Sequence, residues 1–232
     1  MIVAAGDILY SQAMITLEKI KRNRQVQVYV TRANEQLGVI GWTEHGKRHS
    51  NRVAKGARMI LTKLGETAKE AELAAIAGYL HDIGNVVNRH NHAQTGAVIA
   101  GRIMSDMGAD PEIVCEIMSA IGNHDEATGG PVSNIGAALI LADKSDVHKS
   151  RVRNPAFITF DIHDRVNYAV KSSRLTVEGK SGLITLHLSI DTKTSPVMEY
   201  FEIFLSRMII ARKAADFLGC KFELTINGTK LM

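Results

Sequence analysis

The sequence predicts a mainly α protein, in which a helical bundle is followed by a small C-terminal α+β subdomain. Capped helical segments follow one another through the first 154 residues, whereas alternating strand patterns with turn signals appear only after Pro155. The 232 residues, 45% of them hydrophobic, suffice for one substantial core with a small appendage. We therefore divide the chain into 1–154, a helical domain with an N-terminal helical extension, and 155–232, a β-β-α-β subdomain that packs on it.

The N-terminal extension contains two segments of different character. Gln12 to Asn23 is amphipathic and is expected to be a helix, but Gln25 to Val30 is β-branched enough to be either a strand or a helix. The helices of the bundle are recognised by capping residues at their starts and by glycines or polar loops at their ends. They are expected to run from Thr43 to Leu64, from Thr67 to the pair His81-Asp82, from Asn91 to Met107, from Glu112 to Gly122, and from Ser133 through Asp143 toward Arg151.

The C-terminal segment combines a hairpin with helices. No internal repeat or low-complexity linker separates it from the bundle, so we expect the two parts to pack together. A helix is expected over 161–170, a β-hairpin over 174–178 and 183–190 around a Gly-Lys-Ser-Gly turn, a long helix from Pro196 to Leu218, and a third strand from Lys221 to Ile226.

Composition argues against several classes of protein. No stretch reaches the roughly 18 apolar residues that span a bilayer, and Met1 to Gly6 lacks the charged and apolar regions of a signal peptide. Cys115 and Cys220 lie far apart in apolar surroundings, so we expect buried thiols in a reducing compartment, the cytoplasm. Aromatic residues are only 5% of the chain, which disfavours binding to a nucleic-acid polymer.

The net charge of +4 is distributed unevenly. Lys and Arg outnumber Asp and Glu by 11 to 4 in residues 1–63 and by 14 to 9 in residues 144–232, whereas Asp and Glu outnumber them by 11 to 3 in residues 64–143. An acidic centre between basic flanks suits a cation site that also attracts an anionic substrate. Basic helix faces that are simply solvated would give the same distribution.

The acidic centre contains the residue types that bind divalent metals. Four imidazoles and three carboxylates lie at spacings that one helical bundle can bring to one point, and they suit a metal of hard or borderline character. These residues are His49, His81, Asp82, His92, His124, Asp125 and Asp143. The sequence therefore predicts a metal site.

The same residues resemble the HD-domain superfamily of metal-dependent phosphohydrolases over roughly Thr43 to Arg153. The resemblance is carried by the strings His49-Ser50-Asn51-Arg52-Val53-Ala54, His81-Asp82-Ile83-Gly84, Asn123-His124-Asp125-Glu126 and Leu141-Ala142-Asp143, together with His92. Within the superfamily the chain is similar to the HD-GYP branch, in which His-His-Glu precedes a Gly-Tyr-Pro loop. Here Asp125 stands for the second His and Gly130 for the Tyr.

The resemblance implies an HD-domain bundle with two divalent ions, which in such sites lie roughly 3.5–4 Å apart and activate water for attack on a phosphate ester. Asp82 would bridge the ions. His49, His81 and Asp143 would complete the shell of one ion, and His92, His124 and Asp125 that of the other. Shells of this kind accept manganese, iron, nickel, cobalt, zinc or magnesium.

Basic residues after Asp143 are candidates for contact with the substrate. If the helix continues, Lys144, Val147 and Arg151 share one face, and Lys144 and Arg151 are expected to bind phosphate oxygens; a solvated helix end is the alternative. His148 is a candidate proton donor to the leaving group. His45 precedes His49 by four residues and is expected to contact either the substrate or a ligand.

These features predict a metal-dependent hydrolase of a phosphomonoester or phosphodiester, with a nucleotide or another small phosphate as the substrate and not a polymer. The alternatives are a degenerate cyclic-dinucleotide phosphodiesterase, a non-catalytic domain that binds a nucleotide or metal and signals through its C-terminal part, and an iron-dependent oxygenase of the HD fold. No membrane partner is expected, and the sequence leaves a homo-oligomer open.

Overall fold

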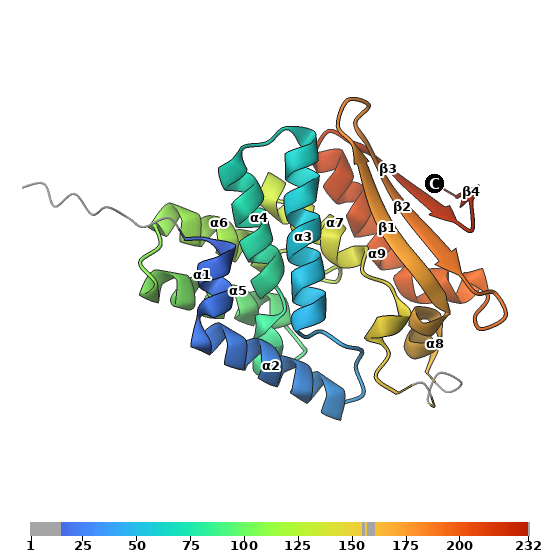
Figure 1. The fold of residues 1–232 in the computed structure, drawn as a ribbon, viewed down its shortest axis with the longest axis horizontal. Coiled ribbons are helices and arrows are strands. Elements are labelled where there is room, and N and C mark those ends of the chain that lie inside the picture. Colours follow the sequence, from blue (N-terminus) through green and yellow to red (C-terminus); the bar gives the residue numbers. More distant parts are fainter. Residues whose placement is uncertain (1–14, 155, 157–160, 232) are drawn as a thin grey trace, which may run out of the picture.

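Helices from the first 144 residues surround one another and form the larger part of the molecule, as the computed structural model shows (Figure 1). The structure describes residues 15–154, 156 and 161–231. The elements of this part are α1 (Leu17–Arg22), α2 (Arg24–Val39), α3 (Lys47–Leu64), α4 (Ala68–Leu80), the 3-10 turn η1 (Ile83–Val86), α5 (His92–Asp106), α6 (Pro111–Gly122) and α7 (Asn134–Lys144). A second 3-10 turn, η2 (Lys149–Arg151), follows it.

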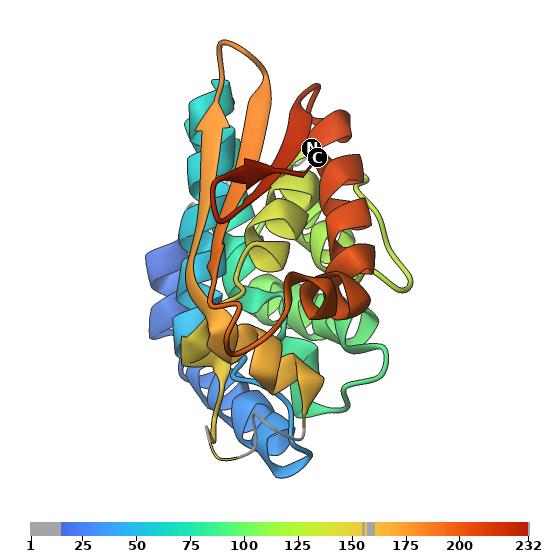
Figure 2. The same ribbon diagram turned by 90° about the vertical axis from the view of Figure 1, so that its right-hand side faces the viewer.

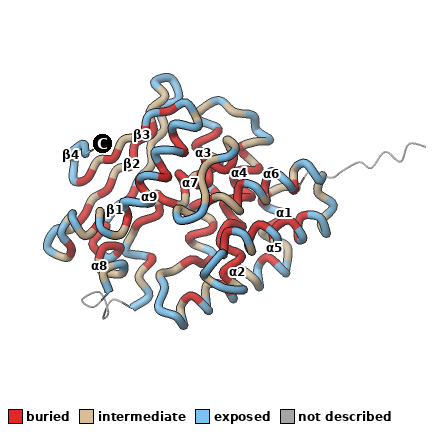
Figure 3. Tube along the Cα trace, turned by 180° about the vertical axis from the view of Figure 1, so that it is seen from behind, coloured by how far each residue is buried: buried red, intermediate tan, exposed pale blue. Residues whose placement is uncertain are grey.

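α4 packs against both α3 and α7 and carries the chain into the interior of the bundle (Figure 3). It begins with a capping box, in which the Thr67 hydroxyl accepts from the backbone N–H of Glu70 and the Glu70 carboxylate accepts from that of Thr67. All residues from Leu73 to Leu80 are buried, as expected for a helix that is apolar on every side. The residues that follow α4, His81 and Asp82, are therefore buried as well.

The C-terminal part adds a four-stranded sheet and two helices. The strands lie in the order β1 (Val170–Glu178), β2 (Leu183–Ile190), β3 (Lys221–Ile226) and β4 (Thr229–Lys230). β1 and β2 are antiparallel, β2 and β3 are parallel with Leu183 opposite Lys221, and β3 and β4 are antiparallel. α8 (Ile162–Ala169) precedes the sheet, while α9 (Val197–Phe217) connects β2 to β3, lies beside the sheet (Figure 2) and packs on α7.

One hydrophobic core runs through both parts. Buried residues of the bundle, such as Ile76 and Leu139, belong to the same cluster as Leu186 and Leu224 of the sheet. The described residues contain no helix that combines the length and the apolarity needed to cross a membrane. The boundary predicted between residues 154 and 155 lies beside residues outside the described ranges and stays a prediction.

The predicted fold class is confirmed, and the ambiguous segment Gln25–Val30 is helical. The Asn23 side chain caps this helix by accepting from two backbone N–H groups, and its buried residues recur at intervals of three or four. Of the predicted helix Gln12–Asn23, residues 12–14 lie outside the described part. The remainder starts at Leu17, after the Thr16 cap. β4 was not predicted.

The predicted start of α3 at Thr43 is wrong, because the helix begins at Lys47 with Gly46 as its N-cap. Residues 42–45 are instead held in a non-helical conformation by long-range bonds. The backbone N–H of Glu44 donates to the Arg151 carbonyl at 2.8 Å, and that of His45 donates to the Asn34 side chain at 3.0 Å. These partners are distant in sequence, so the capping pattern alone did not reveal them.

The predicted continuation of α7 toward Arg151 is also wrong, because the helix ends at Lys144. The Ser145 hydroxyl donates to the Ala142 carbonyl at 2.8 Å, which competes with helix continuation. The chain then turns and buries Asp146, and Arg151 lies in the separate turn η2. A further correction concerns Cys115, which is exposed on α6, whereas Cys220 is buried as expected.

Candidate metal centre

Six of the seven predicted ligands come from helix ends that meet in the interior of the bundle. They lie in the first turn of α3, directly after α4, at the start of α5, after α6 and in the last turn of α7. In that order they are His49, His81 with Asp82, His92, His124 and Asp143. All are buried except Asp143, which is half-buried.

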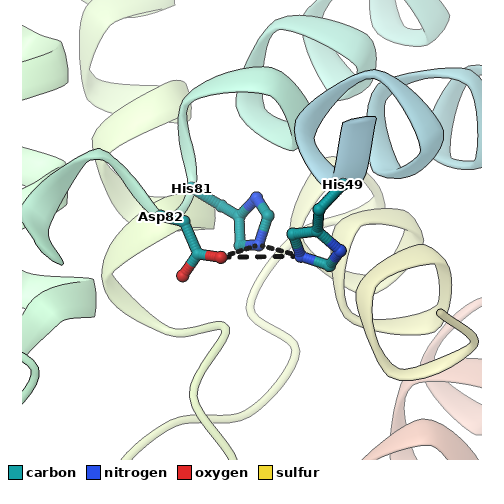
Figure 4. A group of neighbouring side chains, drawn as sticks. All are labelled: His49, His81 and Asp82. Atoms are coloured by element: carbon teal, nitrogen blue, oxygen red, sulfur yellow. Dashed lines mark hydrogen bonds and ion pairs between the residues drawn. The ribbon is translucent and has the colours of Figure 1, made fainter. Parts of the chain in front are cut away.

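Four of these side chains form one compact group, three of which are drawn in Figure 4. His49 Nε2 lies 3.2 Å from His81 Nε2, and Asp82 Oδ2 lies 3.5 Å from the first and 3.2 Å from the second. Asp143 Oδ1 is 3.3 Å from His49 Nε2 and 3.6 Å from His81 Nε2. Atoms bound about 2.1 Å from one ion are themselves about 3.0–3.4 Å apart, so this spacing fits a shared ion.

Two further histidines extend the group on the other side of Asp82. His92 Nε2 lies 3.6 Å from Asp82 Oδ1, and the His124 ring lies 5.1 Å from that of His92 and 5.0 Å from that of His81, between centroids. Three overlapping sets have donor atoms within 4.8 Å of one another: His49, His81 and Asp82; His81, His124 and Asp143; and Asp82, His92 and His124. Asp82 thus faces two sets through different oxygens, as a bridging carboxylate does.

The Nδ1 atoms of all four imidazoles are occupied by acceptors. His81, His92 and His124 each place Nδ1 against the carbonyl oxygen three residues earlier, at 2.9, 3.1 and 2.6 Å. His49 Nδ1 lies 2.7 Å from Asp146 Oδ2. Because carbonyl and carboxylate oxygens only accept, each Nδ1 carries the proton, and in the neutral ring Nε2 is left with a lone pair for a metal.

The HD pair is brought to His92 by a close backbone contact at Gly84. A Cβ atom on Gly84 would lie 2.0 Å from the His92 carbonyl oxygen and 2.4 Å from the Gly96 nitrogen, so only glycine fits. The next residue, Asn85, donates from Nδ2 to Asp82 Oδ1 at 2.9 Å and orients that carboxylate. The local sequence after His81 therefore sets the geometry of the pair.

The donor set fits a divalent cation. Asp82 Oδ2 is buried without a hydrogen-bond donor among the described residues, which is costly for a carboxylate oxygen. His49 Nε2 and His81 Nε2 face each other at 3.2 Å, close enough for both nitrogens to bind one cation. Mixed imidazole and carboxylate donors suit several transition metals and also the harder manganese and magnesium ions.

The pKa shifts within the group also favour a positive charge at this position. Burial lowers the pKa of His81, but Asp82 and Asp143 outweigh it and raise that pKa to about 10. Burial raises the pKa of Asp82, yet His81 and His45 hold it well below its usual range. His124, which has no such carboxylate in direct contact, has its pKa lowered by burial. The two carboxylates therefore remain ionised, and a cation is favoured beside them.

Asp125, the seventh predicted ligand, lies apart from the Nε2 side of the cluster. Its Oδ2 is 3.5 Å from His92 Nδ1, and its Oδ1 accepts from the backbone N–H of Ala127 at 2.8 Å. It belongs to none of the three donor sets. The structure thus places Asp125 behind His92, and its role as a metal ligand stays a prediction.

Lys144 contacts carboxylates within the bundle instead of extending toward solvent. Its Nζ lies 2.7 Å from Asp143 Oδ2 and 2.6 Å from Glu126 Oε2, and the residue is buried. Burial lowers the pKa of Lys144, but Asp143 and Glu126 raise it by more. Glu126 also pairs with Arg207 of α9, at 3.1 Å. Lys144 therefore fixes the orientation of Asp143.

The other predicted substrate contacts occupy different positions. Arg151 is buried, and its Nη1 donates to the Asp146 carbonyl at 3.0 Å. His45 is buried beside His49, with ring centroids 5.4 Å apart. His148 has Nδ1 against the Ser150 hydroxyl at 2.9 Å and Nε2 against the Lys171 carbonyl at 3.2 Å, so its described bonds do not lead to the cluster. A catalytic role for His148 stays an unsupported prediction.

Sequence reasoning gave no role to four residues that organise the site: Asn85, Arg89, Glu126 and Asp146. The fully buried Asp146 carboxylate is the largest omission, because it contacts His49, Arg48 and Arg52. Burial raises the pKa of Asp146, but the bond from His49 and the nearby arginines lower it far below its usual range. Its position three residues after Asp143 was the one local signal.

Comparison with known proteins identifies the class. Residues 47–148 match the model of the HD domain family, and this range contains all seven predicted ligands. Together with the clustering of His49, His81, Asp82 and Asp143, the match makes residues 47–148 an HD domain, a superfamily whose members bind divalent metals.

Two known proteins are similar to parts of the chain. The uncharacterized protein MJ1020 of Methanocaldococcus jannaschii is 27% identical over 169 residues, which cover 63% of this chain and 65% of that protein. The chain therefore spans about two thirds of the length of this relative. The crystal structure of a predicted HD superfamily hydrolase from an uncultured Thermotogales bacterium has 27% sequence identity and a TM-score of 0.44, and the likeness covers 58% of this chain and 75% of that one.

Proposed function

We propose that the protein is a metal-dependent phosphohydrolase that cleaves a small phosphate ester, with a nucleotide as the leading candidate. One observation carries the proposal: imidazole and carboxylate donors from five helix ends converge, and each imidazole has its Nδ1 atom held so that Nε2 is left for a metal. The HD-domain match over residues 47–148 supports the same class of reaction.

We assign two divalent ions to the site, with Asp82 as the shared ligand. His49, His81 and Asp143 would complete the first shell, and His92 and His124 the second. When bound, such ions lower the pKa of a water molecule and polarise a phosphoryl oxygen. Manganese, iron, nickel, cobalt, zinc and magnesium are all compatible with these donors.

The surrounding residues orient the ligands and supply charge toward an anionic substrate. Asp146 fixes His49, Lys144 fixes Asp143, and Asn85 fixes Asp82, each through a contact of 2.7–2.9 Å. Arg89 lies 3.9 Å from Asp82 Oδ1 and stacks on the Trp42 ring, 4.6 Å from its centroid. A guanidinium beside the proposed second ion favours phosphate oxygens there.

The direct test starts with protein purified without chelator and without a metal-binding affinity tag. Elemental analysis gives the resident metal, and a phosphate-release screen over monoesters, diesters and a cyclic dinucleotide follows with each metal restored. Asp82→Ala is expected to remain folded and to lose activity by several orders of magnitude. Asp106→Ala is the matched control, because Asp106 is an exposed carboxylate paired only with Arg102.

The outcomes separate the candidate functions. Activity on the cyclic dinucleotide alone would favour the phosphodiesterase. Tight metal or nucleotide binding without turnover would favour the non-catalytic domain, and an air-sensitive coloured iron centre the oxygenase. Full activity of Asp82→Ala with normal metal content would overturn the hydrolase mechanism.

A further inference from the structure

A cavity of about 230 Å³ lies where helices α8 and α9 of the C-terminal part meet the segment between α2 and α3. Its wall includes Trp42 and Thr43 from the segment before α3, Arg151 from η2, Asn167 from α8, and Phe204 and Arg207 from α9. None of the seven predicted metal ligands lines it. The cavity is therefore distinct from the metal centre, although Arg151 belongs to its wall and has Asp82 and Asp143 among its charged neighbours.

The Arg151 side chain has a donor that no described residue satisfies. Only 3% of the residue is exposed, and its Nε is buried without a hydrogen-bond partner in the described part of the chain. Proteins rarely leave a buried N–H without an acceptor. A guanidinium in a cavity wall is a geometric match for the oxygens of phosphate or carboxylate. This side chain thus points to an oxyanion as the missing partner.

Arg207 brings a second guanidinium to the same cavity from the opposite part of the molecule. Its Cζ lies 4.7 Å from the Phe204 ring centroid, and its Nε donates to Glu126 at 3.1 Å. These contacts hold the side chain, and within the described residues they use only Nε, so the terminal nitrogens can bind another acceptor. Arg151 and Arg207 repel each other electrostatically, and an anion between them would relieve that repulsion.

One part of the cavity wall carries two carboxylates. Asp161 and Asp164 line it at the start of α8, where the Asp161 carboxylate also accepts from the backbone N–H of Asp164 at 3.1 Å. Carboxylates accept hydrogen bonds from hydroxyl and amino groups. A ligand with an oxyanion at one end and hydroxyl or amino donors at the other would therefore complement both walls.

We propose that this cavity recognises a second oxyanion, phosphate or carboxylate, on the substrate, and that Arg151 and Arg207 determine specificity for it. The preferred substrate then carries two anionic groups, one hydrolysed at the metal centre and one held by the two arginines. The C-terminal part acquires a role in substrate selection through Arg207. This inference rests on the proposed function for the hydrolysed group, but anion binding in the cavity requires no metal.

The first test measures binding in metal-free protein. Trp42 is the only tryptophan of the chain and lines the cavity, so its fluorescence reports on occupancy. Titration with inorganic phosphate or with acetate is expected to change the emission. The anion that binds with the higher affinity identifies the type of oxyanion that the cavity prefers. Arg207→Gln should weaken that binding by about tenfold, as expected for loss of a charge-assisted bond. Arg165→Gln is the control, because Arg165 pairs with Glu199 between α8 and α9 but does not line the cavity.

The second test compares substrates in the metal-loaded enzyme. Fructose 1,6-bisphosphate is paired with fructose 1-phosphate, and 3-phosphoglycerate with glycerol 3-phosphate. The doubly anionic member of at least one pair should have the higher kcat/KM, and Arg207→Gln should abolish that preference, measured as the ratio of the two kcat/KM values within the pair. Arg207→Lys, which keeps the charge toward Glu126, should restore part of it.

Two results would overturn the anion site itself: emission that responds to neither anion, or a response that is identical in the parent and in Arg207→Gln. Anion binding in the cavity without any hydrolysis would instead refute the proposed function and leave the cavity's role as an oxyanion site intact. Equal kcat/KM values within both pairs would refute the role in substrate selection.

Discussion

His49 Nδ1 lies 2.7 Å from Asp146 Oδ2, whereas the Nδ1 atoms of His81, His92 and His124 each have a backbone carbonyl oxygen as their hydrogen-bond acceptor. A carboxylate holds the ring orientation and increases the basicity of Nε2 more than a neutral carbonyl does. Asp146 lies in a different part of the sequence from His49, so this pair connects the end of α7 to the start of α3.

The first prediction concerns this pair. Asp146→Asn should lower metal affinity by about 10–100-fold, because the amide neither fixes the Nδ1–H tautomer as firmly nor raises the basicity of Nε2. Competition with a chelator of known affinity measures the change. Asp106→Asn removes an exposed carboxylate paired with Arg102 and should leave the affinity unchanged. Affinity of Asp146→Asn within twofold of the parent would show that the pair does not support the metal.

What the sequence could and could not predict follows from the range of the interactions. The start of α4 after Thr67 and the start of α6 next to Glu112 depend on residues within one turn, and both were predicted to within one residue. Asp146 contacts His49 across 97 positions, and Glu44 contacts Arg151 across more than a hundred. No local pattern encodes such contacts, so the start of α3, the end of α7 and the role of Asp146 appeared only in the folded chain.

A second prediction concerns Lys144, which was first expected to bind phosphate. Lys144→Met should destabilise the metal-free protein by about 3–5 kcal/mol, because it leaves Asp143 and Glu126 without their shared cation in a largely buried site. Urea unfolding measures this loss. The double variant Lys144→Met/Glu126→Gln should recover part of it. If the sole role of Lys144 were to bind substrate, Lys144→Met would raise KM and leave the unfolding curve unchanged.

A third prediction concerns pH. In the metal-free protein the pKa of His81 is raised to about 10 by Asp82 and Asp143, which outweigh burial. The stability that protonated His81 contributes is thus fully present below the unfolded pKa of about 6.5 and is lost as the pH rises through about 10. Binding of a metal near pH 7.5 must displace this proton. Calorimetric titrations in buffers of different ionisation enthalpy should show release of about one proton, and His81→Gln should not release it.

The fourth prediction concerns the number of ions. At saturation the protein should bind two equivalents of metal, and His92→Ala should bind one, because His92 belongs only to the set shared by Asp82 and His124. Elemental analysis after removal of unbound metal gives the ratio. His90→Ala is the control, since His90 is exposed and belongs to none of the donor sets. One equivalent in both the parent and His92→Ala would indicate a mononuclear site.

The last prediction concerns the glycine that follows the HD pair. Gly84→Ala places a Cβ atom 2.0 Å from the His92 carbonyl oxygen and 2.4 Å from the Gly96 nitrogen. Because both of these are backbone atoms, η1 and the start of α5 must separate. Asp82 lies two residues before Gly84, and His92 provides the carbonyl oxygen that the new Cβ atom would meet. The separation should therefore break the 3.6 Å contact between Asp82 Oδ1 and His92 Nε2 and release the second ion. Gly130→Ala is the matched control, because its Cβ would meet no atom within 4 Å and its backbone is not left-handed. Metal analysis and thermal unfolding should show a lowered metal content and melting temperature for Gly84→Ala alone. A Gly84→Ala protein that keeps two ions and the parental melting temperature would mean that the backbone contact does not set the distance between the two ligands.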